Sequence, residues 1–441
     1  MDLVRSVGGG RDRGEREIHE VSGRGHTADQ LDVPGRVRDC SSVRERARAP
    51  GERIRGRTIE LDGLRAVAMS LVFVYHFGLF TVPWLAEGED LAAPTTWGAR
   101  IIPNLHIGVE IFFVLSGVLI YGPFIRARVA GRLLPSLGRY ALRRAARIYP
   151  AYWLAVAVFL AAGDIRIDGA GALVRHLTLT QTYFGAPAGE GLAIAWTLVV
   201  EVSFYCFVPV WAWFVRRWSI RGEAIVLATI AIAAHGLRWW LEWHDVWPPL
   251  AVLPPAMASL APGMLLAIAL AGRDAGDRGA ARLVDSVARN RVWCWAGAVL
   301  AFFVLVRVSY ASVMFSILTG SMRARHEVLA PTIAVLIVAP VVLGGASARG
   351  FRWLRRRSVV AVGTVSYGAY LWHHPLMVRH LDVDAMRAGS TWDALLVMLG
   401  LFIVVCGLAA LSWTWLERPA LGLADRVSRT RASVTGLQGA P

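Results

Sequence analysis

The stretch Leu64-Arg-Ala-Val-Ala-Met-Ser-Leu-Val-Phe-Val-Tyr-His76 holds two ionisable side chains, Arg65 and His76, within a run of apolar residues. Ten residues separate the two. Eleven steps of about 100° on an α-helix return to within roughly 20° of the start, so both side chains share one helix face, about 16 Å apart along the axis. If the segment crosses a membrane, Arg65 lies at one interface and His76 near the middle of the ~30 Å hydrocarbon layer.

A histidine at that depth is a candidate site residue, because burying an ionisable side chain in a membrane is costly. Imidazole can also take up and return a proton near neutral pH. The alternative is a His76 that hydrogen-bonds a neighbouring helix and only packs. The spacing of the two residues leaves both interpretations open.

The composition is too apolar for a soluble globular protein. Of 441 residues, 55% are hydrophobic, the mean hydropathy is +0.47, and 18 residues are Trp. Soluble chains have roughly 45–50% apolar residues, and Trp is enriched at membrane interfaces. The formal charge of +15 comes from arginines that lie mostly between apolar segments. We interpret them as determinants of membrane topology rather than as contacts to nucleic acid. The four cysteines form no CxxC pair, so neither a disulfide framework nor a metal site is expected.

Ten apolar segments predict an all-α polytopic membrane protein with about ten transmembrane helices. They cover approximately 64–84, 105–125, 148–162, 195–215, 224–241, 250–271, 292–308, 328–343, 360–378 and 392–415. Residues 1–57 are rich in Arg and Gly and predict a disordered cytoplasmic tail. Residues 58–420 are the expected transmembrane domain, whose last helix is predicted to end at the charged Glu417-Arg418-Pro419. Residues 421–441 are expected to form a short polar tail.

Arginine-rich connections alternate with less basic ones along the chain. The basic connections follow the second, fourth, sixth and eighth segments, and the modestly basic connection near Arg323 and Arg325 is the exception. The positive-inside rule then places both termini in the cytoplasm and residues 163–192 outside.

Two acidic residues lie within apolar segments. Glu110 is near the outer end of the second segment, and Glu201 lies in the fourth with apolar neighbours on both sides. Each is a candidate site residue. The alternatives are a water-exposed carboxylate at a helix end for Glu110 and an ion-pair partner of an arginine on another helix for Glu201. Glu417 is expected to pair with an arginine.

Two further groups of polar residues are candidates for substrate contacts. Arg144 and Arg147, beside Tyr149, lie about one helical turn apart, and guanidinium groups bind phosphate well. The alternative is that these arginines only set the topology. In the ninth segment, Tyr370 and His373 could contact a ligand on the outer side. His374 follows His373 directly, and two adjacent histidines on a helix are not expected to point to the same pocket.

In their order along the chain, these segments resemble the acyltransferase-3 family of bacterial integral-membrane acyltransferases. The resemblance rests on the Arg–ten–His spacing within 60–76 and on Phe-Phe-Val-Leu-Ser-Gly within 108–117. It also rests on Arg-Ala-Ala-Arg-Ile-Tyr-Pro within 144–153, on 196–205, on Ser-Tyr-Gly-Ala-Tyr-Leu-Trp-His-His-Pro at 366–375, and on Glu-Arg-Pro at 417–419. Two positions in 196–205 depart from the pattern: Thr197 stands in the place of a serine, and Val202 stands where an acidic residue is common.

The resemblance implies an O-acyltransferase in the bacterial cytoplasmic membrane. It would move an acyl group, acetyl or another short chain, from cytoplasmic acyl-CoA to a hydroxyl of a cell-surface or lipid-linked glycan. His76 would be the general base, with Arg65 and Glu201 beside it. The residues expected to bind substrate are Arg144, Arg147, Tyr149, Glu110, Tyr370 and His373. Acyl-CoA is a co-substrate, and no other cofactor is expected.

Several alternatives stay open at this point. The acceptor could be a secreted small-molecule glycoside, and intramembrane His and Glu also suit a proton-coupled transporter. His76 could act as general base in a direct transfer or could be acylated first. Many family members carry an extra periplasmic domain that is not recognised in this sequence, so the chain is expected to act alone or with a separate partner.

Overall fold

The computed structural model describes residues 50–85, 97–185, 190–244, 251–308, 320–344, 349–382 and 390–437. The chain divides into two units, Met1–Ala49 and Pro50–Pro441. The first unit, and with it most of the predicted tail 1–57, lies outside the described residues. Throughout the described part the regular structure is helical and includes no strand, which confirms the all-α class.

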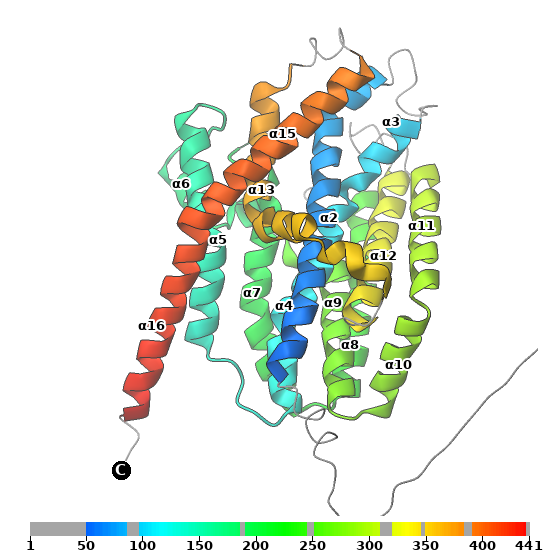
Figure 1. The fold of residues 1–441 in the computed structure, drawn as a ribbon, viewed down its shortest axis with the longest axis vertical. Helices are drawn as coiled ribbons and strands as arrows, with labels where there is room; N and C mark the ends of the chain where they lie inside the picture. Colours follow the sequence, from blue (N-terminus) through cyan, green and yellow to red (C-terminus); the bar gives the residue numbers. More distant parts are fainter. Residues whose placement is uncertain are drawn as a thin grey trace, which may run out of the picture. The chain divides into compact units, whose positions relative to one another are not determined.

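The helices follow one another as shown in Figure 1. They are α2 (Pro50–Leu85), α3 (Trp97–Ile101), α4 (Ile107–Val129), α5 (Leu137–Ala161), α6 (Ala170–Leu177), α7 (Trp196–Phe214), α8 (Ile220–Trp243), α9 (Leu253–Asp274), α10 (Arg278–Arg289), α11 (Arg291–Val308), α12 (Gly320–Gly344), α13 (Arg357–His380), α15 (Thr391–Ser412) and α16 (Arg418–Leu437). Short 3₁₀ segments include Ile102–His106 before α4 and Ala193–Ala195 before α7. Each of the ten apolar segments is helical.

The last predicted segment does not end where the sequence suggested. A π-helical turn, Trp413–Glu417, joins α15 to α16, and the helix continues to Leu437. The Glu-Arg-Pro stretch therefore lies inside a longer helical element instead of ending it. Pro419 lacks the N–H that a regular helix interior would use, and it directly follows the π-helical turn, where the α-helical hydrogen-bond pattern is already interrupted.

Five helical stretches of the described chain are long and apolar enough to cross a membrane. They are Ile102–Val129, Ala193–Arg217, Ile220–Leu241, Leu253–Asp274 and Trp392–Ser428. A sixth results if Arg278–Arg289 and Arg291–Arg307, which meet at a bend of 69°, form one span. This length and composition identify a membrane protein, whereas the number of ten spans stays a prediction.

Burial distinguishes the helices of the bundle interior from those at its surface. In Ile102–Val129, which contains α4, 78% of the most apolar 18-residue stretch is buried inside the protein. The helix α4 packs along α9. In the Trp392–Ser428 stretch only 17% is buried, although its hydropathy is higher. An exposed apolar helix of this kind is stable where lipid, rather than protein, surrounds it.

Small residues let α4 and α9 approach closely. A Cβ at Gly117 would overlap the backbone carbonyl of Leu260 and the Cα of Gly263, and a Cβ at Gly263 would overlap the carbonyl of Val114. Backbone contact of this kind is the usual way in which membrane helices gain packing energy. The pair forms a fixed wall beside the site described below.

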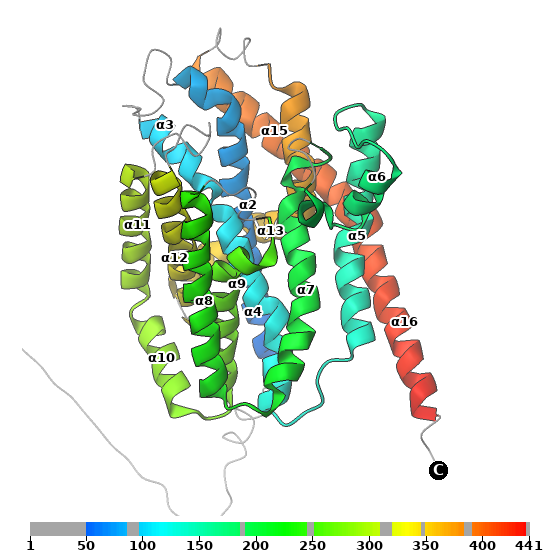
Figure 2. The ribbon, with the colours of Figure 1, turned by 180° about the vertical axis from the view of Figure 1, so that it is seen from behind.

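Three of the four arginine-rich connections gather at one end of the bundle. Figure 2 shows the α4–α5, α7–α8 and α9–α10 connections together at the lower end, whereas α3 and α6 lie at the upper end. The fourth, Arg349–Arg355, lies farther along the bundle, beside Gly63 of α2, so the alternation predicted from the sequence holds in space for three of the four connections.

Candidate active site

A cavity of about 830 Å³ lies between α2, α4, α5, α7 and α13. Its apolar wall comes mainly from α4, including Val109, Phe113 and Leu119. Its polar wall comes mainly from the first half of α5, where the sequence predicts arginines one helical turn apart on the cytoplasmic side, before the third segment. Because α5 begins at Leu137, the arginines of that stretch are fixed on a helix.

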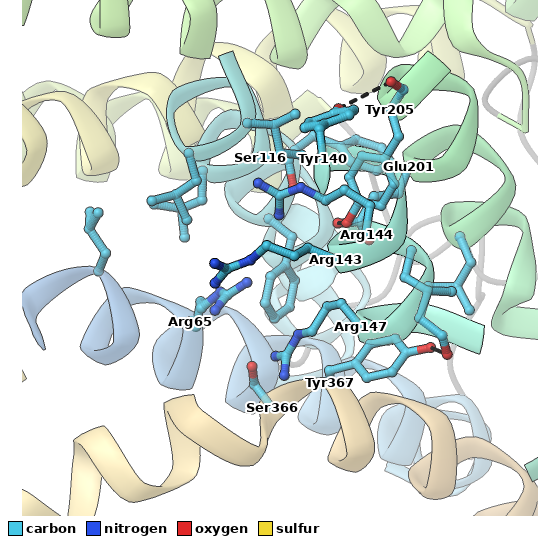
Figure 3. A pocket seen from close by; sticks show the side chains of 18 of the residues that line it. Arg65, Ser116, Tyr140, Arg143, Arg144, Arg147, Glu201, Tyr205, Ser366 and Tyr367 are labelled. Carbon is cyan, nitrogen blue, oxygen red and sulfur yellow. Dashed lines mark hydrogen bonds between the residues drawn. The ribbon is translucent and has the colours of Figure 1, made fainter. Parts of the chain in front are cut away.

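Five arginines line the cavity, together with the carboxylates of Asp62 and Glu201. Three of the arginines, Arg139, Arg143 and Arg147, are spaced four residues apart and so share one face of α5. Arg144 follows on the same helix, and Arg65 reaches the cavity from α2. Figure 3 shows the guanidinium groups of Arg65, Arg143, Arg144 and Arg147 turned toward the same space.

Carboxylates neutralise some of these arginines. Arg147 donates a hydrogen bond to the buried Glu417 at 3.0 Å, as expected for Glu417. Arg143 pairs with Asp425 of α16 at 2.9 Å. Arg65 lies 3.7 Å from Asp62 one turn earlier. The cavity arginines therefore differ in how much charge they can offer to a ligand.

Arg144 and Arg139 form no ion pair with a carboxylate in the described residues. Aromatic rings hold Arg144 instead: its guanidinium carbon lies 5.7 Å from the centroid of Tyr140 and 5.3 Å from that of Tyr205. Contacts with aromatic faces orient the guanidinium without cancelling its charge. Arg144 thus keeps its full charge toward the cavity.

The tyrosines around the cavity are themselves fixed by hydrogen bonds. Tyr140 donates to the backbone carbonyl of Tyr205 at 3.1 Å, and Tyr205 donates to Glu201 at 2.5 Å. Burial raises the pKa of the Tyr140 phenol, and the charge of Arg144 opposes that shift. Tyr140 therefore stays a neutral donor at physiological pH.

His76 lies on the same continuous helix as Arg65 but outside the cavity lining. Its Nδ1 lies 2.9 Å from the carbonyl oxygen of Val72 and 3.1 Å from Nε2 of His373 on α13. His373 is fully buried, and its Nδ1 lies 2.7 Å from the carbonyl oxygen of Tyr370. Both ring nitrogens of His373 are thus used within the protein.

Tyr370 connects the cavity with the histidine pair. Its side chain lines the cavity, where its hydroxyl accepts a hydrogen bond from Thr197 at 2.9 Å and donates one to the carbonyl of Ile194 at 3.0 Å. Its backbone carbonyl faces His373. Thr197, which departs from the serine expected there, keeps the hydroxyl that this contact needs.

The structure brings five of the nine predicted site residues to the cavity. These are Arg65, Glu201, Arg144, Arg147 and Tyr370. His76 and His373 form their own pair. Tyr149 does not line the cavity, and its hydroxyl lies 3.4 Å from the carbonyl of Thr178 just after α6.

Glu110 also lies away from the cavity, in a buried ion pair. Its carboxylate accepts hydrogen bonds from Arg238 of α8 at 3.0 Å and from Ser259 of α9. Arg238 is fully buried and also donates to the carbonyl of Pro255 at 2.8 Å. This contact joins three helices of the interior.

Sequence reasoning missed several residues of the cavity. Arg139 could have been found, because it stands four residues before Arg143 on a predicted arginine face. Tyr205 stands four residues after Glu201, which is the spacing of their hydrogen bond. No signal in one sequence pairs Arg144 with Tyr205 or Glu417 with Arg147, because these contacts join segments far apart in the chain.

Comparison with known proteins identifies the family of this chain. The family model described as an acyltransferase domain matches residues 58–416, which is most of the chain. The chain belongs to the acyltransferase-3 family. Membership indicates a membrane-bound O-acyltransferase. No solved structure shows significant similarity to this chain.

Three relatives of this family member illustrate its range. It is 26% identical to nodulation protein 10 of Rhizobium leguminosarum over 86% of this chain and 97% of the relative. It is 27% identical to YrhL of Bacillus subtilis, provisionally described as a peptidoglycan O-acetyltransferase, over 81% of this chain and 54% of the relative. It is 23% identical to the peptidoglycan O-acetyltransferase OatA of Listeria monocytogenes, over 81% of this chain and 55% of that protein. The chain thus spans a little over half of the two peptidoglycan relatives.

Proposed function

We propose that this acyltransferase moves a short acyl group from acyl-CoA to a hydroxyl of a cell-surface or lipid-linked glycan in the bacterial cytoplasmic membrane. The observation that carries the proposal is the arginine-lined cavity of about 830 Å³. A volume of this size suits a cofactor-sized ligand, and a ligand with several phosphates suits convergent guanidinium groups.

The proposed topology places this cavity within reach of the cytoplasm. Three of the arginine-rich connections gather at one end of the bundle, which supports a cytoplasmic position for that end and for both termini. Arg144 and Arg139 would bind phosphates of the donor, with Arg65, Arg143 and Arg147 beside them. Ten crossings of the membrane remain the number that we propose.

In the proposed mechanism His76 is the general base. It takes the proton of the acceptor hydroxyl as that oxygen attacks the thioester carbonyl carbon. The carbon–sulfur bond then breaks, and the imidazolium returns the proton to the departing thiolate. A direct transfer of this kind needs no second base, whereas an acylated histidine would need another group to activate the acceptor. Glu201, which accepts a hydrogen bond from Tyr205, and Arg65 would set the electrostatic potential around the thioester.

Incorporation of labelled acyl groups tests the proposal. Membranes from cells that express the protein should transfer label from acyl-CoA to a glycan or glycolipid, and His76→Ala at normal protein level should abolish the transfer. Transfer by His76→Ala above a small fraction of the wild-type rate would exclude the general-base role.

Mass spectrometry of envelope glycans and of secreted metabolites, with and without the gene, identifies the acceptor. A difference confined to a secreted glycoside would favour that acceptor class over the envelope. Proton-coupled transport without acyl transfer would exclude the enzymatic proposal altogether.

A further inference from the structure

The contacts of the histidine pair determine which ring nitrogens carry hydrogen. A backbone carbonyl oxygen only accepts hydrogen bonds. Nδ1 of His373 faces the carbonyl of Tyr370 at 2.7 Å, and Nδ1 of His76 faces the carbonyl of Val72 at 2.9 Å. Each Nδ1 must therefore carry the hydrogen of its neutral ring.

This assignment leaves Nε2 of His373 with a lone pair, 3.1 Å from Nδ1 of His76. The Nδ1–H of His76 is thus shared between the carbonyl of Val72 and the ring of His373. The two rings lie 4.8 Å apart at 68°, which is compatible with a hydrogen directed at a lone pair in the plane of the second ring. Nε2 of His76 then also carries a lone pair and is the basic nitrogen.

The position beside a catalytic histidine is usually taken by a carboxylate, which fixes the tautomer and stabilises the imidazolium. In the described residues no carboxylate forms an ion pair with His76 or His373. A neutral imidazole provides the same acceptor without a buried negative charge, which is costly in the membrane interior. The ring of His373 is held in turn by the carbonyl of Tyr370 and by the ring of Phe73, whose centroid lies 6.4 Å away.

We propose that His373 is a positioning residue that holds His76 with Nδ1–H toward α13 and Nε2 free for the acceptor hydroxyl. This inference rests on the proposed function of His76. When His76 takes the proton of the hydroxyl, its Nδ1–H becomes a charged donor, and the hydrogen bond to His373 strengthens. His373 therefore acts on the transition state and not on the binding of the donor.

Substitution of His373 has a defined kinetic consequence. His373→Leu removes the acceptor, so kcat should fall by about 10- to 100-fold while KM for acyl-CoA stays the same. Loss of the acceptor also makes the imidazolium of His76 less stable, so the acid limb of the kcat profile should move to lower pH. His373→Gln places an amide oxygen near the position of Nε2 and should restore both values in large part.

The groups that face His76 provide the control. Besides His373 they are His374, whose ring centroid lies 5.2 Å from that of His76, and Tyr75, at 4.9 Å; the ring of His106 lies 5.7 Å from that of Tyr75. His373 and His374 thus both face His76, contrary to the expectation that only one of two adjacent histidines could do so. His374 is the neighbour of His373 on the same helix but forms no hydrogen bond with His76 in the described contacts. His374→Leu should therefore keep kcat within a few-fold of the wild type.

A spectroscopic measurement on the wild-type protein avoids variants that fail to fold. In protein labelled with ¹³C,¹⁵N-histidine, solid-state NMR distinguishes the two neutral tautomers, and spectra of His76→Gln and His373→Gln assign the signals. We expect the Nδ1–H tautomer for both residues. An Nε2–H tautomer at either residue would overturn the inference whatever the kinetics show.

The outcomes separate this inference from the proposed function. If the wild type transfers acyl groups and His76→Ala does not, but His373→Leu is fully active, only the role of His373 is excluded. The same holds if His373→Leu loses activity with an unshifted pH profile that His373→Gln does not restore, because packing alone would then explain the loss. If the wild type transfers no acyl group from acyl-CoA, the proposed function itself fails.

Discussion

At the scale of single residues, the cavity arginines are not equivalent. Arg147 is neutralised by Glu417 and lies between the rings of Tyr367 and Trp413, at 5.5 and 5.2 Å from their centroids. Arg144 has aromatic neighbours and no carboxylate partner in the described residues. Arg147 is therefore partly a structural residue, whereas Arg144 has its whole charge available for a ligand.

Arg144→Ala should raise KM for acyl-CoA by roughly tenfold or more, because a charge-assisted hydrogen bond to phosphate contributes about 1.5–3 kcal/mol. Steady-state rates in membranes at several donor concentrations measure this effect. Arg216→Ala is the matched control, since Arg216 lies on the connection between α7 and α8 and packs on Trp213 outside the cavity. An equal KM for wild type and Arg144→Ala would assign Arg144 to topology alone.

At the scale of helices, the buried ion pair of Glu110 and Arg238 joins α4 to α8. Removing one partner of such a pair leaves an uncompensated charge in a medium of low dielectric constant. The structure thus gives Glu110 a role in joining helices, and its predicted contact with substrate can be tested separately.

Arg238→Ala should destabilise the protein by about 3–5 kcal/mol, because Glu110 is then left buried and unpaired. The double variant Arg238→Met, Glu110→Leu should recover most of this loss. Thermal unfolding in detergent measures both. Arg221→Ala, which removes the exposed pair with Asp277 at 3.5 Å, should leave the unfolding temperature essentially unchanged, because water screens an exposed ion pair.

Glu110→Gln distinguishes the two roles of Glu110. We expect a lower unfolding temperature and an unchanged KM for acyl-CoA. A raised KM with normal unfolding would place Glu110 among the substrate contacts, as the sequence suggested.

The helices were largely predictable from the sequence, and the contacts between them were not. Apolar runs long enough for a helix locate α4, α7 and α9, because burial in lipid or protein requires such runs. The helical arrangement of the arginines at the start of α5 was also predicted. The continuation into α16 was missed, since this polar helix depends on packing against α5. The Arg65–His76 spacing identified one half of the histidine pair. Its partner could be listed as a candidate, but only the fold shows that His373 faces His76.

At the scale of the whole molecule, the proposed orientation determines which side supplies the donor. Four of the five cavity arginines belong to α5, which begins at the end of the bundle where three of the basic connections lie. If that end faced outward, the arginines would lie on the side that lacks acyl-CoA. An inverted topology would therefore also exclude the proposed donor site.

Cysteine labelling in whole cells measures the orientation. In a background without the four native cysteines, Val174→Cys on α6 (Val174 is 59% exposed) should react with an impermeant thiol reagent. Leu133→Cys, between α4 and α5 (Leu133 is 96% exposed), should react only after lysis. The reverse pattern would invert the topology.

The arginines of the cavity also have a consequence for turnover. With acyl-CoA as donor, the phosphates that they bind remain on the coenzyme after the thioester is cleaved, so the spent coenzyme is held as firmly as the loaded one. Free coenzyme then competes for the cavity with nearly the affinity of the donor. The rate would follow the ratio of acylated to free coenzyme in the cell instead of the amount of donor alone. Surface modification would thus slow whenever the supply of activated acyl groups declines, without a separate regulator.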